Sequence, residues 1–182
     1  MKPQSNKDCG FTLLELMTVF VVIAILVAML LPAFDHLKSR AERAACMNNL
    51  KSLYVSADAY LQSQGHWPQI PANLIQGDSK EYARLWHEAL QPYGLSPKNW
   101  ICPTVQRTTK NPDYLKPENL RVDYIATPFD DNPIIPRKYP THPWFAERGD
   151  VHGDGNLVVF TNGQIKSLSE IVRDSGGLHP AP

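Results

Sequence analysis

The sequence predicts an α+β protein in which one long N-terminal helix packs on a small antiparallel β-sheet with proline-rich loops. Three observations lead to this prediction. An uncharged apolar block fills residues 16–34, an amphipathic helical pattern continues to residue 64, and a strand–turn–strand pattern occurs near residues 157–168. All four tryptophans and nearly all of the prolines lie after residue 66, which indicates a loop-rich head with an aromatic core.

The chain has 182 residues, enough for one modest domain and an additional element. Its 18 lysines and arginines balance its 18 aspartates and glutamates, so the formal net charge is zero. Nucleic-acid binding usually requires a basic excess or a basic stripe. We therefore expect no nucleic-acid partner.

The apolar block from Leu16 to Phe34 carries no charge, and Thr18 is its only hydroxyl side chain. At about 1.5 Å per residue its helix approaches the ~30 Å of a hydrocarbon core, and residues 11–15 complete a span. A secretory signal peptide fits poorly, because its apolar core is usually about 7–15 residues long and a small-x-small cleavage site should follow. A plain single-span anchor leaves the carboxylate at Glu15 unexplained.

Glu15 places a charged group at the edge of this block. A charged side chain inside a bilayer costs about 2.5–3.5 kcal/mol on insertion scales and usually has a partner. Cleavage between Gly10 and Phe11 would create a cationic amine about one helical turn away. Glu15 of one subunit could then pair with this amine on a neighbour and fix the axial register, or it could lie at the interface in contact with water.

The run from Lys7 to Leu16 (KDCGFTLLEL) resembles the N-terminal signal of type IV pilins and type II secretion pseudopilins. That signal is a short charged leader ending in glycine, then Phe-Thr-Leu-x-Glu and an apolar helix. The resemblance implies a pilin-like fold, cleavage after Gly10 by a prepilin peptidase, N-methylation of Phe11 and a subunit-docking role for Glu15. It also implies that the leader is cytoplasmic and the head is extracytoplasmic, which the positive-inside rule leaves undecided here.

Pro32 falls where this family often has a helix-breaking proline. Independently of the family, Pro32 lacks an N–H and its ring clashes with the carbonyl of Ala28, so we expect a kink or a locally unwound turn. A simple helix end at the membrane exit is the alternative.

Four segments follow from these patterns: a leader at 1–10, a transmembrane or filament-core helix at 11–34, an amphipathic continuation at 35–65 and a globular head at 66–182. The amphipathic part ends at Gly65, a plausible C-cap with Pro68 beyond it. Its apolar stripe, expected to face the sheet, consists of Cys46, Leu50, Leu53, Tyr54, Ala57 and Leu61.

The head has two clear element signals and one weak one. Ser79–Leu90 has the pattern of a short helix with Ser79 as its N-cap. The pair Asn162-Gly163 between two apolar runs predicts a hairpin with a type I′ turn. Arg121–Thr127 alternates weakly and could be a strand.

Three segments of the head resemble a bacterial pseudopilin-like subgroup. They are the run from Cys46 to Lys51 (CMNNLK), the run from Trp100 to Pro103 (WICP), and His152 followed by nine residues and a turn pair. The subgroup usually has Asp-Gly at that turn. Asn162 here keeps the turn geometry but lacks the carboxylate.

Cysteine use fits a disulfide-permitting compartment. Cys9 would leave with the leader, so the mature chain would retain Cys46 and Cys102. A bridge between them could add about 2–4 kcal/mol of stability. Alternatively, both are buried thiols that pack as small hydrophobic groups.

Calcium is the one cofactor that the resemblance suggests, since major secretion pseudopilins often hold it in a C-terminal loop. The oxygen donors available are Asp130, Asp131, Asp150 and Asp154. An EF-hand is excluded, because the position of its bidentate glutamate is Thr161. These acids could equally be solvated residues that shape turns.

No nucleophile elbow, zincin helix or phosphate loop occurs, and we expect no enzyme activity. The expected function is a structural subunit of a type II secretion pseudopilus. Its partners would be a prepilin peptidase, copies of itself or other pseudopilins, the inner-membrane assembly platform and inner-membrane lipid. The alternatives are a type IV pilus or DNA-uptake minor pilin, and a membrane-anchored enzyme or sensor that uses the leader only as an anchor.

Overall fold

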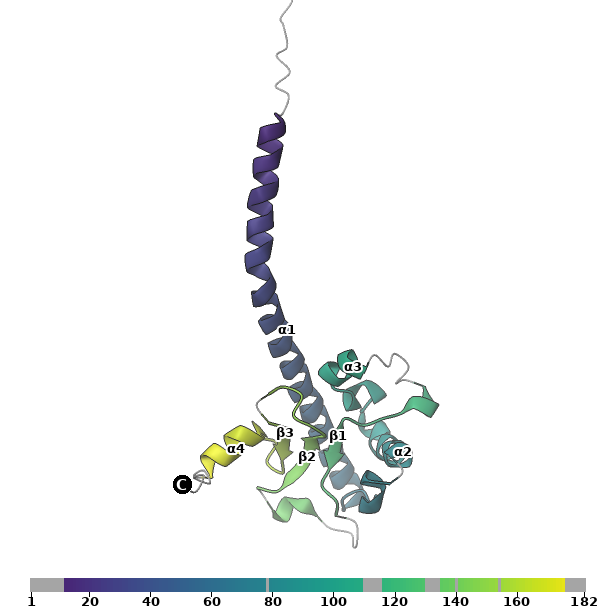
Figure 1. Cartoon of the computed structure of the whole chain (residues 1–182). Helices are drawn as coiled ribbons and strands as arrows, with labels where there is room; N and C mark the ends of the chain where they lie inside the picture. Colours follow the sequence, from purple (N-terminus) through teal and green to yellow (C-terminus); the bar gives the residue numbers. More distant parts are fainter. Residues whose placement is uncertain are drawn as a thin grey trace, which may run out of the picture. The chain divides into compact units, whose positions relative to one another are not determined.

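The computed structural model describes residues 12–77, 79–109, 116–129, 135–139, 141–153 and 155–175, without the side chains of residues 32, 33 and 117. The chain divides into two compact units, Met1–Lys38 and Ser39–Pro182. Helix α1, Leu13–Gln64, contributes to both units (Figure 1).

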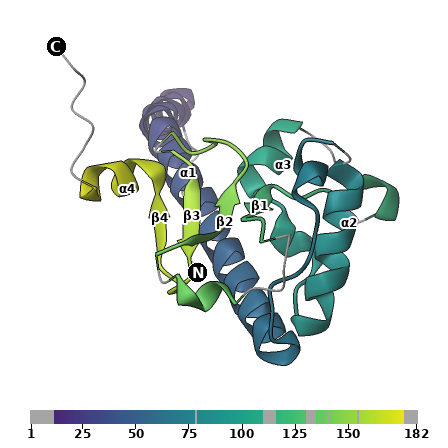
Figure 2. The same ribbon diagram turned by 90° about the horizontal axis from the view of Figure 1, so that it is seen from below.

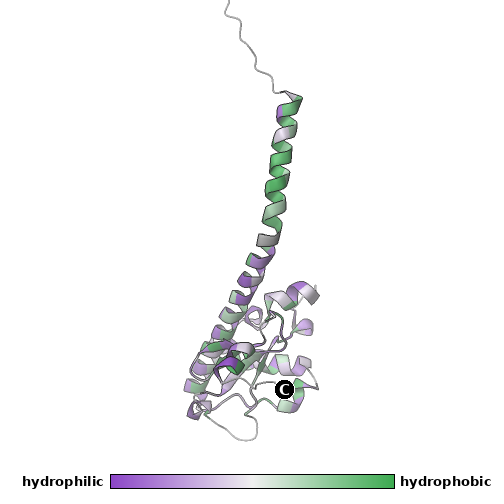
Figure 3. Ribbon diagram, turned by 60° about the vertical axis from the view of Figure 1, so that its left-hand side comes forward, coloured by the Kyte–Doolittle hydropathy of each residue, from purple (hydrophilic) through white to green (hydrophobic). Residues whose placement is uncertain are grey.

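From Leu16 to Phe34, helix α1 carries no charged residue. Every large apolar side chain described between Leu13 and Phe34 is between 49% and 76% exposed. Figure 3 shows this stretch as hydrophobic and the later part of α1 as mainly hydrophilic. The stretch is long and apolar enough to cross a membrane.

The backbone of α1 is helical on both sides of Pro32 and at Pro32 itself. The locally unwound turn that the sequence allowed is therefore not observed. A proline within a helix removes one backbone hydrogen bond but does not have to end the helix. A kink at Pro32 stays a prediction.

In the second unit, α1 buries the stripe that the sequence predicts. Cys46, Leu50, Leu53 and Ala57 are fully buried and Leu61 is 6% exposed, whereas Tyr54 is half-buried. The helix ends at Gly65, which has φ +77° and donates its N–H to the carbonyl of Leu61 at 2.9 Å. A left-handed glycine after the last turn is the common way to close a helix, so the predicted C-cap is confirmed.

The sheet has four antiparallel strands in the order β1-β2-β3-β4 (Figure 2). They are β1 (Tyr124–Ala126), β2 (Pro143–Glu147), β3 (Leu157–Phe160) and β4 (Ile165–Ser167). Helix α4 lies beyond β4, and α2 lies on the β1 side. A long N-terminal helix with a small antiparallel sheet confirms the predicted α+β fold.

The hairpin between β3 and β4 turns at Thr161, Asn162 and Gly163, and this turn differs from the predicted type I′. The Phe160 N–H donates to the Gln164 carbonyl at 2.9 Å, and the Gly163 N–H donates to the Phe160 carbonyl at 2.8 Å. Gly163 has φ +78°. The result is a three-residue loop with glycine in the left-handed position.

Two contacts explain why the loop has three residues. The N–H of Thr161 donates to the carbonyl of His142 at 2.9 Å, so Thr161 is bonded to the β2 side and not to β4. The side-chain Oδ1 of Asn162 accepts the N–H of Gln164 at 2.9 Å. Asn162 therefore satisfies a backbone donor, which is the usual function of asparagine in turns.

The predicted helix Ser79–Leu90 is present as α2 with the same bounds. It begins at Ser79 itself, so Ser79 is its first residue and not its N-cap. Two more helices, α3 (Pro103–Thr109) and α4 (Leu168–Asp174), were not predicted. Short 3-10 turns lie at Ala72–Ile75, Gln91–Tyr93, Pro97–Trp100, Pro117–Asn119 and Pro136–Lys138.

Helix α4 begins where the second run of the hairpin was expected to continue. Ser167 is its N-cap, with Oγ accepting the Glu170 N–H at 3.3 Å. In return, the Glu170 carboxylate accepts the Ser167 N–H at 2.8 Å. This capping box ends β4 and starts the helix.

The core of the head is aromatic, as predicted. All four tryptophans are at most 2% exposed. Trp67 is central, with its ring centroid 5.1 Å from Trp144, 5.6 Å from Phe145 and 5.9 Å from Trp86. Tyr54 connects α1 to this cluster through a 5.0 Å contact with Trp144. The buried sides of α1, α2 and the sheet thus meet in one core.

Candidate functional site

In the sequence, the predicted processing site directly precedes Thr12, the first residue that the structure describes. Gly10 and Phe11 are outside the described residues, so cleavage and N-methylation there stay predictions. Thr12 and Glu15 are described and form the first turn of α1.

Thr12 and Glu15 form a reciprocal capping box. The carboxylate oxygen Oε2 of Glu15 accepts the Thr12 N–H at 2.9 Å and the Thr12 hydroxyl at 3.0 Å. The Glu15 N–H donates to Oγ1 of Thr12 at 3.2 Å. An acidic group in the first turn also interacts favourably with the helix dipole. Glu15 therefore has a local structural role that the sequence analysis did not anticipate.

The capping box does not use the whole carboxylate. Both bonds are made by Oε2, and within residues 12–77 and the other described ranges Oε1 makes no hydrogen bond. Oε1 can therefore accept from a donor outside the chain without loss of the cap. Capping and docking by Glu15 are compatible.

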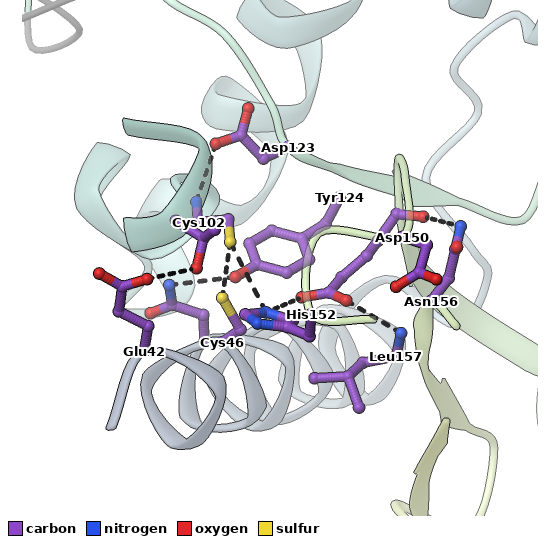
Figure 4. A network of polar contacts seen from close by, with 12 residues as sticks. Glu42, Cys46, Cys102, Asp123, Tyr124, Asp150, His152, Asn156 and Leu157 are labelled. Atoms are coloured by element: carbon purple, nitrogen blue, oxygen red, sulfur yellow. Dashed lines mark hydrogen bonds and ion pairs between the residues drawn. The ribbon is translucent and has the colours of Figure 1, made fainter. Parts of the chain in front are cut away.

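A second group of functional side chains lies inside the head (Figure 4). It consists of Cys46 on α1, Cys102 just before α3, Glu147 at the end of β2 and His152 in the β2–β3 loop. One ligand atom from each lies within 4.8 Å of the others. The Sγ atoms are 2.7 Å apart, Cys102 Sγ is 4.0 Å from His152 Nε2, and that nitrogen is 3.2 Å from Glu147 Oε1.

Burial is nearly complete at this group. Cys46 and Cys102 are 0% and 1% exposed, and the side chains of His152 and Glu147 are 3% and 2% exposed. Charged groups are almost never buried like this unless they are paired or bound to a metal. The arrangement is therefore chemically specific.

Backbone contacts hold Cys102 and Glu147 in place. The Cys102 N–H donates to Oδ2 of Asp123 at 2.8 Å, and Asp123 is itself paired with Arg121 at 3.1 Å. The Leu157 N–H donates to Oε2 of Glu147 at 3.0 Å. This last bond directs the other oxygen, Oε1, toward His152 and the two sulfurs.

The two thiols differ in acidity. A hydrogen bond from Cys46, the largest cause, lowers the pKa of Cys102 to about 6. The pKa of Cys46 is raised, mainly by its hydrogen bond with Cys102 and then by the burial of the thiol. Burial is also the main cause that raises the pKa of the neighbouring Tyr124, followed by the charge of Cys46. The contact between the two sulfurs therefore shifts their pKa values in opposite directions.

The structure places His152 beside Cys46 and Cys102, the two cysteines that the sequence suggested as a possible pair. A Cys46–Cys102 bridge stays a prediction, since both are free thiols here. Glu147 was missed, because nothing in the sequence marks it as buried. The one available signal was its position after the apolar run Trp144, Phe145 and Ala146.

The calcium candidates are not assembled into a site by the described residues. Asp130, Asp131 and Asp154 lie outside them. Asp150 is exposed, and its Oδ1 accepts the Gly153 N–H at 2.8 Å. This is the turn-shaping role that the sequence offered as the alternative. Calcium binding stays a prediction.

Comparisons with known proteins agree with the N-terminal signal. Residues 5–31 match the family model described as the prokaryotic N-terminal methylation motif. The chain is 34% identical to the type IV major pilin protein PilA of Myxococcus xanthus (strain DK1622) over 61 residues. This stretch is 34% of this chain and 28% of that protein. Over 64 residues the chain is 31% identical to the type II secretion system core protein G of Escherichia coli (strain K12), 35% of this chain and 44% of that protein.

No solved structure gives a significant match. The resemblance to type IV pilins and type II secretion pseudopilins is confirmed, but the matched stretches cover only about a third of this chain and less than half of either relative.

Proposed function

We propose that this chain is a pilin-like structural subunit of a type II secretion pseudopilus, cut after Gly10 and assembled through its N-terminal helix. The observation that carries the proposal is the methylation motif at residues 5–31, which includes the exposed apolar part of α1 from Leu13 to Leu31. The head would remain outside the cytoplasm, and the function would be structural and not catalytic.

The apolar part of α1 needs a partner that is itself apolar. Large apolar surfaces on all sides of a helix are stable only in lipid or among other apolar helices. Inner-membrane lipid would cover this surface in the precursor, and the helices of neighbouring subunits would replace the lipid in the filament. A prepilin peptidase and the inner-membrane assembly platform would carry out processing and assembly.

Glu15 supplies what apolar packing alone cannot, a fixed axial position. Apolar helices can slide past one another at little cost, whereas an ion pair in an apolar medium is strongly favoured at one register. Oε1 of Glu15 can accept the amine of Phe11 from a neighbour while Oε2 keeps the cap of its own helix.

The second candidate is a type IV pilus subunit, which the similarity to the Myxococcus protein favours. The two candidates share processing and helix packing and differ in what the filament does. Deletion of the chromosomal copy separates them: loss of protein secretion with intact pili supports the pseudopilus, and loss of pili with intact secretion supports the pilus.

N-terminal mass spectrometry of the protein from its own cells tests the processing step. The assembled fraction should begin with N-methylated Phe11 and should lack residues 1–10. Gly10→Val should remain uncut and stay in the membrane. An intact Met1 in the assembled fraction of the unaltered protein would contradict the proposal.

Glu15→Gln tests docking separately from capping. Glutamine at this position still accepts the Thr12 N–H, so the capping box survives, but the charge is lost. We expect normal insertion and cleavage, and at least a ~10-fold lower amount in sheared filaments, measured by quantitative immunoblot.

Thr12→Val is the matched control, because it removes the capping hydroxyl and keeps the charge. Its filament yield should remain close to that of the unaltered chain. If Glu15→Gln assembles as well as Thr12→Val, the carboxylate has no role in register.

A further inference from the structure

We propose that Cys46, Cys102, His152 and Glu147 bind one divalent, thiol-preferring metal ion of the zinc class. The site would be structural, because all four ligands come from the protein and no position is open to a substrate. The inference is independent of the N-terminal processing discussed above.

The donor set fits this metal class. Zinc in structural sites is held by four ligands, mainly cysteine sulfur and histidine nitrogen, with carboxylate oxygen as a third type. Here two sulfurs, one imidazole nitrogen and one carboxylate oxygen lie within 4.8 Å of one another. Calcium and magnesium prefer oxygen ligands and do not suit such a set.

The distances are close to those of a tetrahedral site. With bonds of about 2.3 Å to sulfur and about 2.0 Å to nitrogen or oxygen, the ligand atoms of a tetrahedron lie roughly 3.3–3.8 Å apart. The observed separations are 4.0 Å between Cys102 Sγ and His152 Nε2, and 3.2 Å between that nitrogen and Glu147 Oε1. The two sulfurs, 2.7 Å apart, would have to separate by about 1 Å to accept the ion.

The carboxylate is oriented as a ligand requires. Oε2 of Glu147 is occupied by the Leu157 N–H, so Oε1 is the oxygen that faces Nε2 of His152. Hydrogen bonds that fix a ligand from outside the site are a regular feature of protein metal centres. Asp123 has the same role for Cys102, whose N–H it accepts.

Charge balance also favours a cation. On binding, both thiols would give up their protons, so two thiolates and one carboxylate would surround the ion in a region with almost no exposure to water. A divalent cation offsets most of this charge, and binding releases the protons that the thiols carry, without transfer of electrons. Buried charges are normally either paired or bound to metal.

The predicted disulfide competes for the same two sulfurs. A bridge would use only Cys46 and Cys102. A metal ion uses all four side chains. It would also tie α1 to the β2–β3 loop and to the segment before α3, which the sheet hydrogen bonds do not do.

The test uses the full chain in detergent, with Cys9→Ser so that Cys46 and Cys102 are the only two thiols. The protein is reduced, stripped with a chelator and titrated with Co²⁺ and then with Zn²⁺. We expect one equivalent of Co²⁺ to give the absorption bands of tetrahedral coordination with thiolate charge transfer, and Zn²⁺ to displace it.

Variants identify the ligands. Cys102→Ser and His152→Gln should each weaken metal binding by more than about 100-fold. Loss of a residue that only hydrogen-bonds to a metal ligand typically costs ~10–100-fold, so a larger loss identifies a ligand. His142→Gln is the matched control, because His142 is a half-buried histidine whose ring lies tilted against Phe129 with centroids 5.2 Å apart. The metal affinity of this variant should equal that of the unaltered site. Circular dichroism establishes that each variant is folded.

Three results would each overturn the proposal. The reduced chain could give no thiolate–cobalt band. The Zn²⁺ affinity of folded His152→Gln could equal that of His142→Gln. Protein taken from its own cells, with thiols alkylated at harvest, could contain a Cys46–Cys102 disulfide in every molecule.

Discussion

Replacing Trp67 with alanine should lower the free energy of unfolding of the head by about 3–5 kcal/mol. Trp67 is fully buried and contacts the rings of Trp86, Phe129, Trp144 and Phe145 at centroid distances of 5.9, 5.6, 5.1 and 5.6 Å. It therefore connects the segment after α1 with α2 and β2. A cavity at this position removes contacts from all of them, and a loss of this size is a large part of the stability of a typical domain.

Two matched variants separate packing from other effects. The indole Nε1 of Trp67 has no hydrogen-bond partner in the part of the chain that the structure describes. Trp67→Phe therefore keeps an aromatic ring and loses no polar contact, and it should cost clearly less than the alanine variant. Tyr139→Ala removes an aromatic ring that is 49% exposed and should have little effect.

The measurement is urea unfolding of the full chain in detergent, followed by near-ultraviolet circular dichroism. The slope with urea should stay the same, so that the change in midpoint reports stability. A Trp67→Ala midpoint equal to that of Tyr139→Ala would show that the aromatic cluster is not the core.

Much of the helical structure could be predicted from sequence because it is local. The stripe from Cys46 to Leu61 and the pattern of Ser79–Leu90 repeat at the helical period, and both are buried as expected. The C-cap at Gly65 also depends only on the adjacent residues.

The missed strand β2 and the three-residue hairpin loop depend on distant contacts. Strand β2 begins with Pro143, which is tolerated at the first residue of a strand, and its register against β3 shifts between Pro143 and Phe145. No short-range pattern marks such a strand. The three-residue hairpin loop exists because Thr161 bonds to His142, which lies 19 residues earlier.

The metal-ligand group could not be predicted for the same reason. Cys46 and Cys102 are 56 residues apart, and Cys102 and His152 are 50 apart. Spacing within the sequence marks local motifs, whereas this group is assembled by α1 packing against β2 and its following loop. The sequence analysis paired Cys46 with Cys102 as a possible bridge and noted His152 separately, and only the fold adds Glu147.

Replacing Glu147 with alanine should destabilise the head by about 3–5 kcal/mol even when no metal is present. The carboxylate accepts the buried Leu157 N–H at 3.0 Å and pairs with His152 at 3.2 Å, with its side chain 2% exposed. Alanine would leave both partners buried without an acceptor. The measurement is urea unfolding in the presence of a chelator and a reductant.

Glu147→Gln and Glu88→Ala make this result interpretable. The amide of Gln still accepts the Leu157 N–H, so we expect a smaller loss of about 1–3 kcal/mol. Glu88 is 58% exposed and pairs with Arg84, and exposed pairs contribute little, so Glu88→Ala should leave stability nearly unchanged. If Glu147→Ala unfolds at the same urea concentration as Glu88→Ala, the carboxylate does not support β2 and β3.

The stabilities of Glu147→Gln and Glu147→Ala, compared with and without metal, also test the metal site. The comparison separates the backbone hydrogen bond of the Glu147 carboxylate from its proposed bond to the metal. In chelator, Glu147→Gln should be more stable than Glu147→Ala, since the amide oxygen of Gln can still accept the Leu157 N–H. With Zn²⁺ added to the reduced protein, the unaltered chain should gain stability that both variants lack, because Oε1 is the proposed ligand and an amide is a poor substitute for it. An equal gain in Glu147→Gln would exclude Oε1 from the metal and leave Glu147 with its backbone role alone.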